Sequence, residues 1–122
     1  MTVPNAGPGS TGDAQPPYIA VVFTSVRRPG DDGYDEAAGR MDELARRQPG
    51  YLGHDSARDP GPGGLGITVS YWASEAAADG WRREAEHAAI QRRGRDSWYE
   101  WYSVRVATVT RQHGWPSGAA RG

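Results

Sequence analysis

The sequence predicts one α+β domain whose strands and helices follow the order β-α-β-β-α-β. Two kinds of stretch predict it: four runs rich in β-branched and aromatic residues, and two stretches in which apolar residues recur with the helical period. Clusters of Gly, Pro and Asp separate these stretches. Elements in this order form the ferredoxin-like, or split βαβ, arrangement with an antiparallel sheet. The length of 122 residues suits a single domain.

We expect the folded unit to span residues 18–115, between disordered tails at 1–17 and 116–122. The first tail reads MTVPNAGPGSTGDAQPP and contains no aromatic residue, so it cannot bury enough apolar surface to offset the entropy of ordering it. The folded unit holds all five Trp. So small a domain buries only about 60–65% of its unfolded-chain surface. Some Trp side chains are therefore expected to line a pocket or a subunit interface.

The first half of the domain contains one strand and one helix. The strand is predicted at Tyr18–Arg27, where β-branched and aromatic residues follow one another. A turn sequence, RPGDDG, leads into a helix at Tyr34–Gln48, whose apolar residues have the spacing i, i+3, i+4, i+7. A Pro-Gly pair ends this helix. On its hydrated side, Asp42 and Arg46 have the i,i+4 spacing of a favourable ion pair.

The second half contains three strands and one helix. Tyr51–Arg58 is predicted as a strand, and the loop sequence DPGPGGLG connects it to an alternating strand at Ile67–Trp72. Ser74 is the expected N-cap of a helix at Glu75–Arg93. The last strand is predicted at Trp98–Thr110, where Tyr and Val are frequent.

The first strand also predicts a homodimer. Ile19, Val21 and Phe23 make one of its faces apolar, and Ala20 and Val22 do the same for the other. Such a strand is covered on both sides, yet right-handed crossovers place both helices on one face of the sheet. We therefore expect a second copy to cover the remaining face, sheet against sheet.

Composition excludes several classes of function. The chain has no Cys and no Lys, which excludes thiol nucleophiles, iron–sulfur clusters, Schiff-base enzymes and P-loops. A formal net charge of -1 gives no electrostatic footprint for nucleic acid. No apolar run approaches the roughly 20 residues of a membrane span, and no signal-peptide pattern begins the chain. We expect a cytoplasmic protein with neither nucleic acid nor membrane as partner.

Several motifs resemble one family. The segments PGYLGHDSARD and GITVSYWASEAAADGWRREAEHAAIQRRGRDSWYEWYSVRVATV are similar to the antibiotic biosynthesis monooxygenase domain, over about residues 18–112. The most specific features are the YW-x-S-E entry to the second helix, Trp81 and His87 within that helix, and the Trp98-Tyr99 exit after Gly94. The resemblance implies a dimeric α+β barrel.

The resemblance also implies a chemistry. The quinone-forming members of the family use an electron-rich phenol or enolate that itself donates an electron to O2. The protein then supplies a dry apolar pocket, a group that takes the substrate proton and donors for the oxyanion. We accordingly expect a cofactor-independent monooxygenase of secondary metabolism, acting on O2 and an aromatic or polyketide-like small molecule.

Trp81 and His87 are the candidate catalytic residues. Trp81 has small residues at helical spacing around it, which leaves room for a planar guest; the alternative is a Trp buried in the core. His87 lies about 120° further round the helix, at about 100° per residue. It is a candidate general base or haem ligand, and the alternative is an exposed or interface histidine.

His54, Tyr71, Trp72 and Trp98 are the candidate substrate-binding residues. His54 lies in the second predicted strand and faces either the ligand or the solvent. The aromatic residues of the last two strands divide between the two sheet faces, and the sequence leaves open which set lines the pocket.

Two alternatives remain. One is a haem-binding protein of the same fold, with His87 or His54 as the axial ligand. Haem-degrading relatives carry an Asn on the first strand, where this chain has Thr24 and Ser25 and its only Asn is Asn5. The other alternative is a non-catalytic dimer that binds a hydrophobic metabolite. The spacing of the His residues does not predict a metal site.

Overall fold

Four strands and two helices follow one another in the predicted order. The computed structural model describes residues 14–29, 34–61, 63–92 and 99–115. Its elements are β1 Tyr18–Arg27, α1 Tyr34–Arg46, β2 Tyr51–Arg58, β3 Leu65–Trp72, α2 Glu75–Arg92 and β4 Tyr99–Val109. The β3 strand begins earlier than expected because the pairing of β1 with β3 extends to Leu65, which lies opposite Val26.

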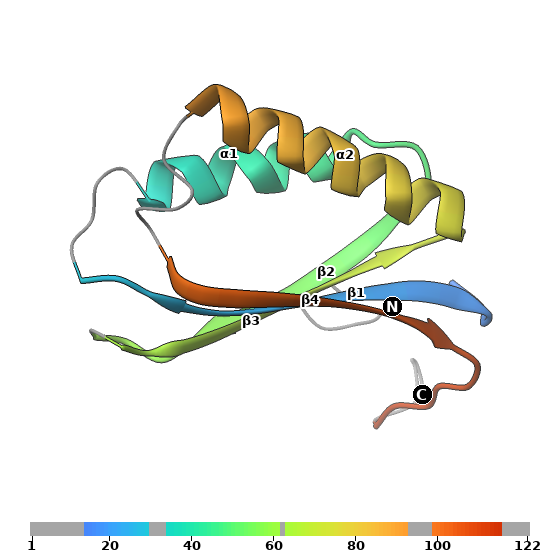
Figure 1. The fold of residues 1–122 in the computed structure, drawn as a ribbon. Helices are drawn as coiled ribbons and strands as arrows, with labels where there is room; N and C mark the ends of the chain where they lie inside the picture. Colours follow the sequence, from blue (N-terminus) through green and yellow to red (C-terminus); the bar gives the residue numbers. More distant parts are fainter. Residues whose placement is uncertain (1–13, 30–33, 62, 93–98, 116–122) are drawn as a thin grey trace.

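The strands form one antiparallel sheet in the order β2-β3-β1-β4. Both helices lie on the same face of this sheet, and the opposite face carries neither (Figure 1). This arrangement confirms the predicted ferredoxin-like α+β fold. On the helix-covered face, Val21 of β1 lies between Ser70 of β3 and Val106 of β4.

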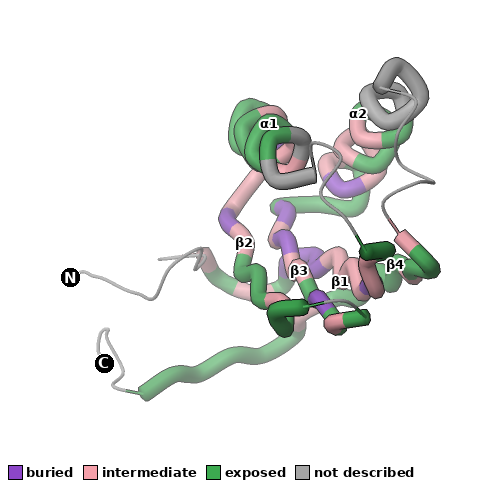
Figure 2. Tube along the Cα trace, turned by 90° about the vertical axis from the view of Figure 1, so that its left-hand side faces the viewer, coloured by how far each residue is buried: buried purple, intermediate pink, exposed green. Residues whose placement is uncertain are grey.

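The core lies where the two helices meet the middle of the sheet. Ile19, Ala45, Trp72 and Ala78 form its buried cluster, and Trp72 has no exposed surface. Figure 2 shows the buried positions concentrated on the inner strands and on the sides of the helices that face them, whereas β4 is mostly exposed. The small residues on the helices allow a close approach around one large indole.

Local capping chemistry holds the helix ends as the sequence predicts. The backbone N–H of Ala77 donates to Oγ of Ser74 over 3.1 Å, which confirms the predicted N-cap of α2. After α1, Gly50 adopts a φ of 82°, a conformation that favours glycine. Neither helix of the described part is long and apolar enough to cross a membrane.

Gly50 gives a test of this packing. A Cβ at Gly50 would lie 2.5 Å from Cβ of Ala77, in addition to the cost of the positive φ. We expect Gly50→Ala to lower the free energy of unfolding by about 1–3 kcal/mol in urea denaturation. Gly39→Ala is the control, because nothing lies within 4 Å of a Cβ there and Ala is the better helix former by about 0.5–1 kcal/mol. Equal effects of the two substitutions would contradict this account.

Candidate functional site

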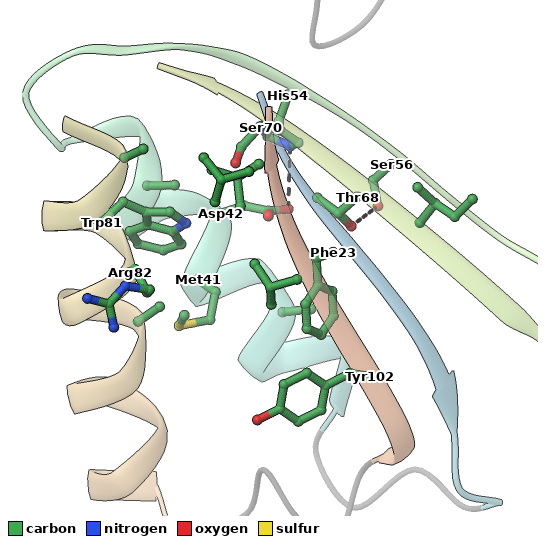
Figure 3. Close-up of a pocket in the computed structure, with 18 of the residues that line it drawn as sticks. Phe23, Met41, Asp42, His54, Ser56, Thr68, Ser70, Trp81, Arg82 and Tyr102 are labelled. Atoms are coloured by element: carbon green, nitrogen blue, oxygen red, sulfur yellow. Dashed lines mark hydrogen bonds and ion pairs between the residues drawn. The ribbon is translucent and has the colours of Figure 1, made fainter. Parts of the chain in front are cut away.

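A cavity of about 680 Å³ lies between the two helices and the sheet, within the size range of small-molecule pockets. Figure 3 shows its walls: Trp81 and Arg82 come from α2, Met41 and Asp42 from α1, and Phe23 from the sheet. The lining is mostly apolar. Polar members lie on both sides of the cavity. Those on β2 and β3 include His54, Ser56, Arg58, Thr68 and Ser70, and those on the helices are Asp42, Glu75, Asp79, Arg82 and Glu86.

Trp81 forms one wall of the cavity, and a second indole holds it in place. The ring of Trp81 stacks on that of Trp72, with centroids 5.8 Å apart and planes 18° from parallel. Trp72 is fully buried behind it and donates from Nε1 to Oγ of Ser70 over 2.9 Å. Ala78 and Ala85 line the cavity beside Trp81. A flat wall with small neighbours suits a planar apolar guest.

His54 lines the cavity floor and has polar groups on both sides of its ring. Its Nδ1 lies 2.5 Å from the hydroxyl of Tyr51. Its Nε2 lies 3.9 Å from Oδ2 of Asp42, and the His54 side chain is only 13% exposed. The dashed line in Figure 3 marks the contact with Asp42 across the cavity. Two elements, α1 and β2, thus contribute to one polar cluster, which we define as Tyr51, His54 and Asp42.

A β-bulge makes this cluster possible. In a regular strand, Tyr51 and His54 would point to opposite faces of the sheet. The pairing of β2 with β3 shifts between Tyr51 and Gly53, so that Tyr51 lies opposite Trp72 while His54 lies opposite Ser70. Both side chains consequently reach the helix-covered face. Burial is the main cause that raises the pKa of the Tyr51 hydroxyl, assisted by Asp42 and Asp55 and opposed by Arg46.

Sequence reasoning missed Asp42 as a site residue. Its i,i+4 spacing to Arg46 predicted a surface ion pair, whereas its carboxylate faces His54 in the structure. The neighbouring i,i+4 pair is present, with Nη2 of Arg47 3.5 Å from Oε2 of Glu43. A signal was available, since Asp42 follows Ala38 by one helical turn and so borders the apolar stripe of α1.

The remaining candidates occupy different places. Tyr71 lies on the helix-free face, where its hydroxyl donates to Oδ2 of Asp55 over 2.9 Å. Trp72 supports Trp81 from the core and does not line the cavity. Trp98 and the side chain of His87 lie outside the described part of the chain. On β4, Tyr102 lines the cavity. The face of β4 that carries Tyr102 is therefore the one that lines the pocket, which the sequence left open.

Charged residues of α2 form the rim of the cavity. Arg82 contacts Asp79 over 2.7 Å and Glu86 over 3.2 Å, and its side chain is 52% exposed. Hydrogen bonding from Arg82 is the main cause that lowers the pKa of Asp79. Solvent screening keeps the contribution of this network to stability small.

Only one described imidazole lines the cavity. His54 is therefore the imidazole within the described ranges that could ligate a haem iron in this cavity, and its Nε2 already faces the Asp42 carboxylate. Among the described residues, no group of three or more His, Cys, Asp or Glu is arranged to hold a metal ion.

Comparison with known proteins identifies the family. The family model for antibiotic biosynthesis monooxygenase matches residues 17–93. YqjZ of Bacillus subtilis (strain 168), described as an uncharacterized protein, is 53% identical over 98 residues, which are 80% of this chain and 84% of YqjZ. The chain belongs to the antibiotic biosynthesis monooxygenase family.

Solved structures support the same fold. SnoaB, a cofactor-independent oxygenase from Streptomyces nogalater, matches with a TM-score of 0.59 at 14% identity, over 84% of this chain and 100% of SnoaB. PA3566 from Pseudomonas aeruginosa also matches with a TM-score of 0.59, at 18% identity, over 80% of this chain and 96% of its own. At these identities the likeness shows a shared fold.

Tyr71 provides a pH-dependent test of the helix-free face. Burial and the hydrogen bond to Asp55 raise the pKa of Tyr71 from 10.0 to about 12. The stability that this group contributes is therefore present below pH 10 and is lost as the pH rises through about 12. In an absorbance titration, the curve of the Tyr71→Phe variant is subtracted from that of the wild-type protein. The difference should show one phenol that ionises near pH 12.

Asp55→Asn is the matched variant for this titration. It removes the carboxylate charge beside Tyr71, so the pKa of Tyr71 should move back toward 10, whereas Asp59→Asn in the exposed loop should leave it in place. An unchanged Tyr71 titration in Asp55→Asn would refute the assigned cause.

Proposed function

We propose that this protein is a cofactor-independent monooxygenase that oxidises an aromatic or polyketide-like small molecule within the cavity. The observation that carries the proposal is the mostly apolar cavity of about 680 Å³ between helices and sheet, with Trp81 as a flat wall. Family membership and the fold shared with SnoaB support the reaction class.

The proposed oxidation of the substrate by O2 requires few protein groups besides such a cavity. Oxidation of a ring CH2 to C=O by O2 releases one water and needs no external reductant, because the ionised substrate supplies the electrons. The protein must exclude water, orient the ring and move protons at more than one step. Trp81 supplies the orienting surface in this proposal, and we retain His87 as the second working residue on α2.

Oxygen consumption with dihydroxynaphthalenes and dihydroxyanthrones tests the proposal. Wild-type protein should consume O2 without added flavin, haem or metal. We expect Trp81→Ala to lower kcat/KM by about 10–100-fold, because the ring loses its positioning surface. His87→Ala should lower kcat by about 100-fold, which is within the range of a general acid–base group.

Arg40→Gln is the control for these rates. Arg40 is half-exposed on α1 and pairs with Glu36 over 3.8 Å, so its loss should leave the rate unchanged. Binding of the same compounds without O2 consumption would reject the oxygenase and favour the non-catalytic binder of a hydrophobic metabolite.

We also propose that the protein works as a homodimer through the helix-free face. Leu65 and Trp101 both lie opposite Val26 in the sheet, and their exposed fractions are 43% and 48%. Large apolar side chains on both sides of Val26, on a sheet face that carries no helix, favour burial against a partner. The same arrangement in a second copy would bring two such faces together.

Sedimentation equilibrium at micromolar concentration tests the dimer. The wild-type protein should sediment with twice the mass of the chain. The double variant Trp101→Arg, Leu65→Arg should sediment as a monomer, because dimerisation would bury two unpaired guanidinium groups of each copy. Glu84→Arg on the exposed side of α2 should remain dimeric. A monomeric wild-type protein would reject the proposal.

A further inference from the structure

We propose that the cluster of Tyr51, His54 and Asp42 receives a hydroxyl group of the substrate and that Nε2 of His54 takes its proton. This inference rests on the proposed function, because it places the first proton transfer of that reaction at a named atom.

The separation of the polar atoms is the first argument. Nε2 of His54 and Oδ2 of Asp42 are 3.9 Å apart, which is too long for a direct hydrogen bond. A ligand hydroxyl has one hydrogen, and because Nε2 and the carboxylate are both acceptors, that hydrogen can go to Nε2 while Asp42 interacts with the charge on the ring. Both residues line the cavity. Nε2 is thus available to a hydroxyl donor from the cavity, and the Asp42 carboxylate lies beside the ring without occupying Nε2.

Tyr51 is the positioning residue of the cluster. Its hydroxyl lies 2.5 Å from Nδ1 of His54, and its ring packs edge-on against the buried Trp72 with centroids 5.6 Å apart. When Nε2 is the base, Nδ1 carries the hydrogen, so the Tyr51 oxygen accepts a hydrogen bond from Nδ1–H both before and after the proton transfer. It therefore holds the ring in both protonation states of His54, which a general base requires. The raised pKa of Tyr51 keeps this phenol protonated at neutral pH.

Asp42 balances the charge that the proton transfer creates. The substrate O–H bond breaks, an N–H bond forms at Nε2, and the electron pair of the broken bond stays on the substrate oxygen. The products are an oxyanion and an imidazolium, and no oxidant or reductant takes part. From α1, the Asp42 carboxylate faces the new imidazolium at 3.9 Å and stabilises it. The oxyanion remains beside the imidazolium as an ion pair.

Several other charged groups near the cavity have partners of their own. On β2, Asp55 accepts a hydrogen bond from Tyr71 on the opposite sheet face. On the α2 rim, Asp79, Arg82 and Glu86 pair with one another. At the other end of the floor, Arg58 donates to the carbonyl oxygens of Ser25 and Gly64.

The apolar lining orients the substrate toward the cluster. Phe23 and Val104 lie opposite each other in the sheet, and they line the same cavity as Trp81. Figure 3 places Trp81 and Phe23 on different walls, with Asp42 and His54 at one end of the space between them. A planar ring between these walls would direct one edge to His54. The ligand is thus apolar over its faces and carries its hydroxyl at the edge.

Anaerobic binding of 4-nitrophenol and 4-nitroanisole tests the inference apart from oxidation. The two compounds differ by one methyl group, and the 4-nitrophenolate anion absorbs at a longer wavelength than the neutral phenol. At slightly acidic pH, where free 4-nitrophenol is mostly neutral, the bound compound should show the anion band. Its affinity, measured by Trp fluorescence, should exceed that of 4-nitroanisole at least several-fold.

Variants separate the roles of the residues. His54→Gln should abolish the anion band and reduce the affinity for 4-nitrophenol to that for 4-nitroanisole. Tyr51→Phe keeps the ring that packs on Trp72, so affinity for 4-nitroanisole should persist while the anion band weakens several-fold. A purely structural role for Tyr51 would instead change the affinity for both compounds alike. Arg47→Gln, on the exposed side of α1, should retain wild-type behaviour.

Three results would overturn the inference. Equal binding of the two compounds with a neutral spectrum would reject the hydroxyl site while leaving a cavity for aromatic molecules and the oxygenase proposal intact. An anion band that persists in His54→Gln but disappears in Arg82→Gln would assign the anion to the α2 rim instead. Failure of the wild-type protein to bind either compound would reject this hydroxyl site. The proposed function would then be tested separately, by the measurement of oxygen consumption.

Discussion

The buried indole of Trp72 is the constraint on which the rest of the structure depends. It has no exposed surface, and it contacts Trp81 of α2, Tyr51 of β2 and, through its N–H, Ser70 of its own strand. One side chain thereby fixes a helix and a neighbouring strand relative to β3. Removal of so large a group would leave a void that the surrounding alanines cannot fill. The cavity wall and the polar cluster are both positioned by this one residue.

The cavity follows from how unevenly the helices cover the sheet. The helices pack over the core around Ile19, Ala45 and Ala78, while the cavity-side residues of β4, Val104 and Val106, remain about half exposed. Small side chains on α1 and α2 allow a close approach at the core but leave space beyond it. The same packing therefore stabilises the fold and leaves an apolar site open to a ligand.

Strand alternation separates two surfaces with different tasks. His54 and Asp55 are neighbours in sequence, yet His54 faces the cavity whereas Asp55 accepts a hydrogen bond from Tyr71 on the other face. Residues of β1 alternate in the same way between Val21 on the cavity floor and Val22 behind it. A partner on the helix-free face would therefore stiffen the strands that carry the floor of the cavity.

The sequence by itself determined the order of elements and the Ser74 cap, because these depend on periodicity and on contacts between near neighbours. Its motifs resembled the family, and for Trp81 it left open a cavity wall or the core. It left open whether His54 faces a ligand or the solvent, and it did not indicate the partners of this residue. Only the tertiary structure decided that Asp42 faces His54, because that contact joins a helix to a strand across the cavity. It also decided that Tyr51 shares the face of His54, because a β-bulge changes strand parity and leaves no periodic signal in the sequence.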